Sequence, residues 1–167
     1  LAELVDARGP LPPKSVRAAA MSLCRVLQYL HGQAAPVICR DVKPQNVIMD
    51  SAGGCHLIDL GAARMYSSDS REDTVLLGTQ ATAPPEQYGY QQTDQRSDIY
   101  SLGILMRYLL YGSYERPTAD NGSALERIIR RCTAFDPQNR YSSVSAVYRT
   151  LKHPYLRRGL CAVSAAA

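Results

Sequence analysis

Two long segments of the chain carry apolar side chains at helical spacing. In residues 14–30 these side chains are Val16, Ala20, Leu23, Leu27 and Leu30. In residues 98–111 they are Ile99, Leu102, Leu105, Met106 and Leu109. A period near 3.6 residues gathers such positions on one face of a helix, so both segments predict amphipathic helices. The first is expected to end at His31-Gly32 and the second at Gly112.

Shorter elements surround these two helices. Residues 1–7, 124–133 and 144–151 predict three more helices. Two apolar runs at 47–49 and 56–58 flank a Gly-rich turn, which is typical of a β-hairpin. Residues 64–82 are rich in serine, threonine and charged side chains and predict a long loop. The expected fold is therefore mainly α with a small β-hairpin element.

Length and composition describe one globular domain. The chain has 167 residues, of which 46% are hydrophobic and 20% charged, enough to bury a single core. No apolar run approaches the roughly 20 residues of a membrane helix, and no secretory signal opens the chain. These features favour a cytoplasmic location. The first residue is leucine, which indicates that the chain belongs to a longer polypeptide, where a membrane anchor stays an open alternative.

Charge and cysteine content narrow the function classes. The net charge of +4 comes mostly from arginines that are spread along the chain. A nucleic-acid interface usually clusters such residues with aromatic side chains, so no nucleic-acid partner is expected. The five cysteines are an odd number and have no C-x-x-C spacing. This pattern fits a reducing compartment and argues against a disulfide framework or a zinc site.

The most informative stretch is residues 39–46, Cys-Arg-Asp-Val-Lys-Pro-Gln-Asn, which is followed by Asp59-Leu60-Gly61. It supplies three oxygen-bearing side chains, Asp41, Asn46 and Asp59, with Lys43 between the first two. Such a set can orient a hydroxyl nucleophile and hold a divalent cation on a polyphosphate. Either motif alone is also common in turns, but the pair is specific. It resembles the catalytic loop and metal-binding motif of protein kinases, H-R-D-x-K-P-x-N followed by D-F-G.

The resemblance implies a role for each of these side chains. Asp41 would accept the proton of the attacking hydroxyl, and Lys43 would neutralise charge on the transferred phosphoryl group of ATP. Asn46 and Asp59 would hold Mg²⁺, with Mn²⁺ as an alternative ion, and through it the nucleotide. Ile48 would be the residue on which the adenine rests.

Three further stretches extend the resemblance toward bacterial serine/threonine kinases. They are Gly78-Thr79 with Pro84-Pro85-Glu86, the run at 97–103, and the run at 136–140. Lys43 and Gly78-Thr79 favour a Ser/Thr acceptor on a protein substrate over tyrosine. By analogy, the Thr79 hydroxyl would bond Asp41 and Lys43.

Two structural roles follow from the same likeness. Asp98 would accept hydrogen bonds from the backbone of the catalytic loop. Arg140 would form a buried ion pair with Glu86.

A regulatory role is also implied. In the family an arginine at the position of Arg40 can pair with a phosphorylated residue of the activation loop. Candidate phosphorylation sites here are Ser67, Ser68, Ser70 and Thr74. The alternative interpretation of these residues is a solvated serine-rich loop.

The chain departs from the family pattern at three positions. Cys39 replaces histidine, Leu60 replaces the phenylalanine of D-F-G, and Thr82 replaces a tyrosine. The first two positions belong to an apolar stack in the family, where a small hydrophobic side chain can serve. For Cys39 the alternative is a reactive thiol, because a nearby arginine can lower the pKa of a cysteine.

The resemblance covers the C-terminal kinase lobe only, residues 1–158, with 159–167 as a tail. A Gly-rich loop and an A-x-K strand, the marks of the N-terminal β lobe, are absent from this chain. The isolated chain is therefore expected to show little or no phosphoryl transfer. The surface left bare, around Cys39, Ile48 and Leu60, is expected to be an exposed apolar patch.

Two other functions compete with an ATP-dependent protein kinase. One is a pseudokinase or scaffold that binds partners without catalysis; the intact set of Asp41, Lys43, Asn46 and Asp59 argues against it. The other is a small-molecule phosphotransferase of the aminoglycoside- or choline-kinase type. Lys43, the Pro-Pro-Glu segment and Asp98 match protein kinases instead.

Overall fold

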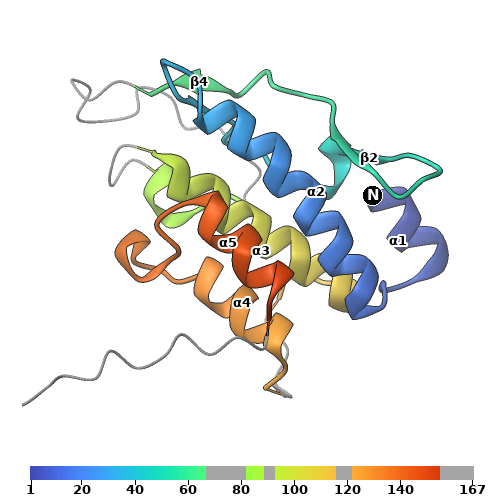
Figure 1. Ribbon diagram of the computed structural model, residues 1–167. Helices are drawn as coiled ribbons and strands as arrows, with labels where there is room; N and C mark the ends of the chain where they lie inside the picture. Colours follow the sequence, from blue (N-terminus) through green and yellow to red (C-terminus); the bar gives the residue numbers. More distant parts are fainter. Residues whose placement is uncertain (67–81, 89–92, 116–121, 155–167) are drawn as a thin grey trace, which may run out of the picture.

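Helices dominate the described part of the molecule, as the sequence predicted (Figure 1). The computed structural model describes residues 1–66, 82–88, 93–115 and 122–154. Its helices are α1 (Ala2–Arg8), α2 (Pro13–His31), α3 (Gln95–Tyr111), α4 (Ala124–Cys132) and α5 (Val144–Lys152). Its strands are β1 (Val37–Ile38), β2 (Val47–Met49), β3 (Cys55–Leu57) and β4 (Arg64–Met65). Short 3₁₀ turns are η1 (Pro44–Asn46), η2 (Pro85–Tyr88) and η3 (Pro137–Asn139).

Helix α3 is the central element of the core. It packs against α2, α4 and α5, and eleven of its residues are buried. The helix begins at Gln95, three residues before the predicted start, because the Asp94 side chain caps it by accepting a hydrogen bond from the Arg96 amide. It ends where predicted, at Gly112, whose φ of 70° is the left-handed conformation that glycine adopts at little cost.

Helix α2 lies beside α3 and also contacts α5 and the β2–β3 hairpin (Figure 1). Its buried face consists of Val16, Ala19, Ala20, Leu23, Cys24 and Leu27. This is the face that the apolar spacing predicted. The other side of α2 is mixed and carries Lys14, Arg25 and the exposed Tyr29, and the helix extends to His31.

Two small antiparallel sheets carry the loops of the site. In the β2–β3 hairpin Val47 pairs with Leu57 and Met49 with Cys55, so the second strand begins one residue earlier than predicted. The Asp50 carboxylate closes the turn by accepting hydrogen bonds from two turn amides. The β1–β4 pair was not predicted, because each strand has only two residues and their partners lie far apart in the sequence.

The four described cysteines are Cys24, Cys39, Cys55 and Cys132, and all of them are buried thiols. Cys161 lies outside the described residues. Among the described helices, none combines the length and the hydrophobicity needed to cross a bilayer.

Candidate active site

The carboxylate of Asp41 is fixed by two neighbouring side chains. The Lys43 ammonium lies 2.7 Å from Asp41 Oδ2. The Asn46 side-chain amide donates to the same oxygen at 2.9 Å and to the Asp41 backbone carbonyl at 3.1 Å. The other carboxylate oxygen, Oδ1, is buried and has no hydrogen-bond partner among the described residues. The loop therefore holds the Asp41 carboxylate in place through Oδ2 and leaves Oδ1 without a hydrogen-bond partner among the described residues.

The hairpin brings Asp59 to the same end of the structure as Asn46. Asn46 immediately precedes β2, and Asp59 is the second residue after the end of β3. The Asn46 carbonyl accepts a hydrogen bond from the Ile58 amide at 3.0 Å, which continues the ladder up to Asp59. Asp59 is exposed, and its Oδ1 accepts a hydrogen bond from the Gly61 amide at 2.8 Å.

Asp98 anchors the backbone that precedes Asp41. This fully buried carboxylate, in the first turn of α3, accepts hydrogen bonds from the Cys39 amide at 2.9 Å and the Arg40 amide at 2.8 Å. Arg40 has φ = 68°, a left-handed conformation that costs a non-glycine residue about 1–2 kcal/mol. The contacts from Asp98 hold the loop in this strained shape, which sets the direction of Asp41.

A second buried carboxylate, Glu86, binds Arg140. The guanidinium donates to both oxygens of Glu86, at 2.6 and 2.8 Å. Ser97 adds a hydrogen bond to Glu86 at 2.9 Å. Together these contacts fasten η2 to α3 and to the chain that follows η3.

The comparison with known families agrees with this geometry. The family model described as "Protein kinase domain" matches residues 1–124. This chain belongs to the protein kinase family. Protein kinases use ATP and Mg²⁺. Three side chains of the predicted site, Asp41, Lys43 and Asn46, lie together here.

Its relatives include bacterial serine/threonine kinases. The chain is 34% identical over 170 residues to the serine/threonine-protein kinase PknL of Mycobacterium tuberculosis, covering 88% of this chain and 42% of that protein. It is 29% identical over 168 residues to serine/threonine-protein kinase F of Synechocystis, covering 90% and 34%. For PknB of Mycobacterium leprae the identity is 27% over 169 residues, covering 87% and 27%. The chain thus spans less than half the length of these relatives.

One expectation about Cys39, its place in an exposed apolar patch, was wrong, and so was the alternative of a reactive thiol. The thiol is fully buried and does not belong to an exposed apolar patch; of the predicted patch, only Ile48 and Leu60 are exposed, at 52% and 46%. Burial, reinforced by the Asp98 carboxylate, raises the pKa of Cys39 to about 12, so it is not an activated thiol. The catalytic loop packs its first residue against α3, and the packing role is the one that the structure supports.

Several predicted residues cannot be placed. Ser67, Ser68, Ser70, Thr74 and Thr79 lie outside the described residues, so their roles stay predictions. Arg40, the predicted phosphate partner, is 5% exposed.

Sequence reasoning missed two side chains near the catalytic loop. Gln87 donates from its amide to the Arg40 carbonyl at 3.1 Å. His31 contacts Asp98 from the end of α2. The only sequence signals were that Gln87 adjoins Glu86 and that His31 ends a predicted helix close before the catalytic loop.

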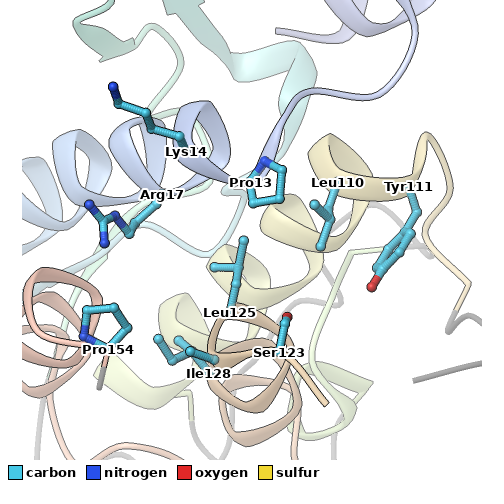
Figure 2. Close-up of a pocket in the computed structure, with 10 residues that line it drawn as sticks. Pro13, Lys14, Arg17, Leu110, Tyr111, Ser123, Leu125, Ile128 and Pro154 are labelled. Carbon is cyan, nitrogen blue, oxygen red and sulfur yellow. The ribbon is translucent and has the colours of Figure 1, made fainter. Parts of the chain in front are cut away.

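Two cavities are formed by different elements of the described part of the chain. One of about 680 Å³ is lined by α1, the β2–β3 hairpin and Ile58, and it includes Ile48. Another of about 360 Å³ is lined by Leu110, Leu125, Ile128 and the charged side chains of Lys14 and Arg17 (Figure 2). Leu110 is roughly 18 Å along α3 from Asp98 at 1.5 Å per residue, so the second cavity lies at the other end of the helix from Asp98.

Proposed function

We propose that this chain is the C-terminal lobe of an ATP-dependent serine/threonine protein kinase. It would transfer the γ-phosphoryl group to Ser/Thr hydroxyls of proteins. The observation that carries the proposal is the convergence of Lys43 and Asn46 on one oxygen of Asp41. Residues 1–158 would form this partial catalytic domain and 159–167 a tail, with the protein working in the cytoplasm.

Asp41 would act on the acceptor hydroxyl. Its Oδ2 is occupied by Lys43 and Asn46, and its Oδ1 lacks a partner among the described residues. A serine or threonine hydroxyl would donate a hydrogen bond to Oδ1 and pass its proton to that oxygen as the hydroxyl oxygen attacks the γ-phosphorus. The bond from the γ-phosphorus to the β–γ bridging oxygen breaks in the same step, and ADP leaves. Lys43, a cation next to the same carboxylate, would offset negative charge on the transferred phosphoryl group.

Asn46 and Asp59 fit a magnesium site by their chemistry. Because the Asn46 amide nitrogen donates to Asp41, its Oδ1 is the atom that remains for a cation. Asp59 is exposed, and its Oδ1 accepts a hydrogen bond from the Gly61 amide. Amide and carboxylate oxygens are the ligands that Mg²⁺ prefers. When bound, Mg²⁺ would neutralise the phosphate oxygens of ATP.

The adenine would rest on the apolar edge of the hairpin. Ile48 and Ile58 are more than half exposed and line the cavity of about 680 Å³ beside α1. A flat apolar base is stabilised on such side chains by burial of both surfaces. These exposed side chains also suit the proposed contact with an N-terminal kinase lobe, which would cover the nucleotide.

The test compares variants of a polypeptide that contains this chain and the proposed covering lobe. Transfer of phosphate from labelled ATP to Ser/Thr peptides is measured with Mg²⁺ present. Asp41→Asn should abolish transfer, while Asp136→Asn, a change at an exposed aspartate in another loop, should not. Transfer that survives Asp41→Asn would refute the role of Asp41. ATP binding without any transfer by the unaltered protein would favour the pseudokinase.

A further inference from the structure

The cavity of about 360 Å³ shares no residue with the candidate active site. It is formed where the first turns of α2, the last turn of α3 and the first turns of α4 meet, and Pro154 completes its lining (Figure 2). Its volume lies in the range of small-molecule sites, about 300–1,000 Å³. Ten residues line it, whereas a protein–protein interface engages roughly 20–30 on each side. The cavity therefore suits a small molecule better than a folded partner.

The apolar wall of the cavity is aliphatic. It consists of Leu110, Leu125 and Ile128. Leu125 and Ile128 are 8% and 3% exposed. The two hydroxyl groups in the lining already serve the start of α4, because Tyr111 donates to the Glu126 carboxylate and Ser123 accepts the Glu126 amide. Such a lining favours a ligand with an apolar body, since burying a polar body would leave its groups without partners.

Two cations line the same cavity. Lys14 and Arg17 are three residues apart on α2, so they lie on one face of the helix. In the part of the chain that the structure describes, neither side chain has a hydrogen bond or an ion pair, and no lining residue is acidic. A solvated helix face would explain the exposed Lys14. It explains Arg17 less well, because Arg17 is partly covered and still lacks a counter-charge.

The start of α2 adds to this positive charge. The helix has 19 residues, no acidic side chain in its first turn and no side-chain cap. The N-terminal end of a helix carries a partial positive charge, so Lys14, the second residue of α2, stands where a cation is unfavourable. An anion bound beside Lys14 and Arg17 would remove this repulsion.

We propose that this cavity binds a medium-chain carboxylate. The alkyl body would lie against the aliphatic wall, and burial of that body would supply much of the affinity. The carboxylate would lie at Arg17, whose guanidinium can donate two parallel N–H groups to it, with Lys14 as a second cation. The site uses none of the residues of the proposed kinase function and does not depend on that function.

The test measures binding to this chain by isothermal titration calorimetry. The probe is decanoate, at concentrations below those at which it forms micelles. Two further probes separate its parts: 1-decanol keeps the alkyl body without the charge, and acetate keeps the charge without the body. Decanoate should bind with one site per chain, 1-decanol more weakly, and acetate without measurable heat.

Variants then place the carboxylate and the alkyl body. Arg17→Gln should weaken decanoate binding about tenfold and leave 1-decanol binding unchanged. The matched control is Arg149→Gln, which removes the same charge from an exposed position of α5 outside the cavity and should change neither. Ala124→Leu adds bulk to the lining and should weaken both probes. Circular dichroism checks that each variant is folded.

Three results would overturn the proposal. The first is no binding of decanoate to the unaltered chain. The second is equal decanoate binding by the unaltered chain and Arg17→Gln, or an equal loss in Arg149→Gln, which would mean general attraction to a basic surface. The third is binding of an acidic peptide that contains leucine without binding of decanoate, which would assign the cavity to a protein partner.

Discussion

Arg140 binds both carboxylate oxygens of Glu86 in the interior of the protein. The two N–O distances are 2.6 and 2.8 Å, and the residues are 2% and 5% exposed. The remaining guanidinium hydrogens go to the carbonyls of Arg96, Ala134 and Phe135. Arg140 thereby joins η2, α3 and the segment that follows α4 at one point.

Replacing Arg140 with methionine should lower the free energy of unfolding by about 3–5 kcal/mol, because Glu86 stays buried without its counter-charge. Arg140→Lys should also be destabilising, since an ammonium cannot bind both oxygens in the same plane. Urea denaturation followed by circular dichroism measures both effects.

The matched control for this pair removes the second charge as well. Glu86→Gln combined with Arg140→Met should be less destabilised than Arg140→Met alone, because no unpaired charge remains. Equal stability of the single and double variants would mean that Glu86 is not left as a buried charge.

Substitutions of Asn46 and Asp59 should distinguish an effect on stability and activity together from an effect on activity alone. Asn46 is buried and bonds Asp41 twice, so Asn46→Ala should cost about 1–3 kcal/mol of stability and also reduce activity. Asp59 is exposed, so Asp59→Asn should change stability by no more than about 0.5 kcal/mol while lowering kcat/KM about 100-fold or more.

The comparison needs thermal unfolding and, in a polypeptide that also contains the proposed covering lobe, peptide phosphorylation at several Mg²⁺ concentrations. Asn139→Ala, at an exposed position of η3, is the control and should alter neither quantity. Full activity of Asp59→Asn at low Mg²⁺ would contradict a metal-binding role for Asp59.

The long helices α2 and α3 could be predicted from the sequence because each buries one continuous stripe of apolar side chains. The apolar spacing of α2 identified its core face, but the start of α3 was missed. Gln95, Arg96 and Ser97 are polar, and the signal for the helix start is the single capping carboxylate of Asp94. The two-residue strands β1 and β4 were missed because they are too short to show alternation.

The candidate site also has residues whose positions the sequence predicted and contacts that it did not predict. Asp41, Lys43 and Asn46 are close in sequence, so their motif sufficed to predict that they lie together. The contact from His31 to Asp98 joins residues 67 positions apart, and no local pattern marks it. The resemblance indicated a packing role for Cys39, but its complete burial depends on how the loop packs against α3.

Buried thiols should make the protein less stable at high pH. Burial raises the pKa of Cys24 and Cys39 to about 12 from an ordinary value of 9.0 and also raises that of Cys132. Above pH 9 the unfolded chain loses these protons while the folded protein keeps them. The stabilisation is therefore complete below pH 9 and is lost as pH rises toward 12.

Cys39→Ala isolates one of these thiols. Between pH 9.5 and about 11 its free energy of unfolding should fall less steeply than that of the unaltered protein, by up to about 1.4 kcal/mol per pH unit. The comparison uses chemical denaturation at each pH under reducing conditions. Parallel curves for the two proteins would mean that Cys39 is not shielded in the folded state.

Gly103 permits the close approach of α3 to the end of α4. A Cβ at this position would lie 2.6 Å from the Cβ of Cys132 and 2.7 Å from Cγ2 of Thr133. Gly103→Ala should therefore destabilise the protein by about 1–3 kcal/mol, although alanine is intrinsically the better helix former by about 1 kcal/mol. The overlap must outweigh that gain, because one of the two contacts is to a Cβ that cannot rotate away.

Combining Gly103→Ala with Thr133→Ser removes the other contact and keeps the hydroxyl that bonds Arg107 and the Ile129 carbonyl. Urea unfolding should show partial recovery in the double variant, whereas a stabilised Gly103→Ala would mean that the helices can move apart at little cost.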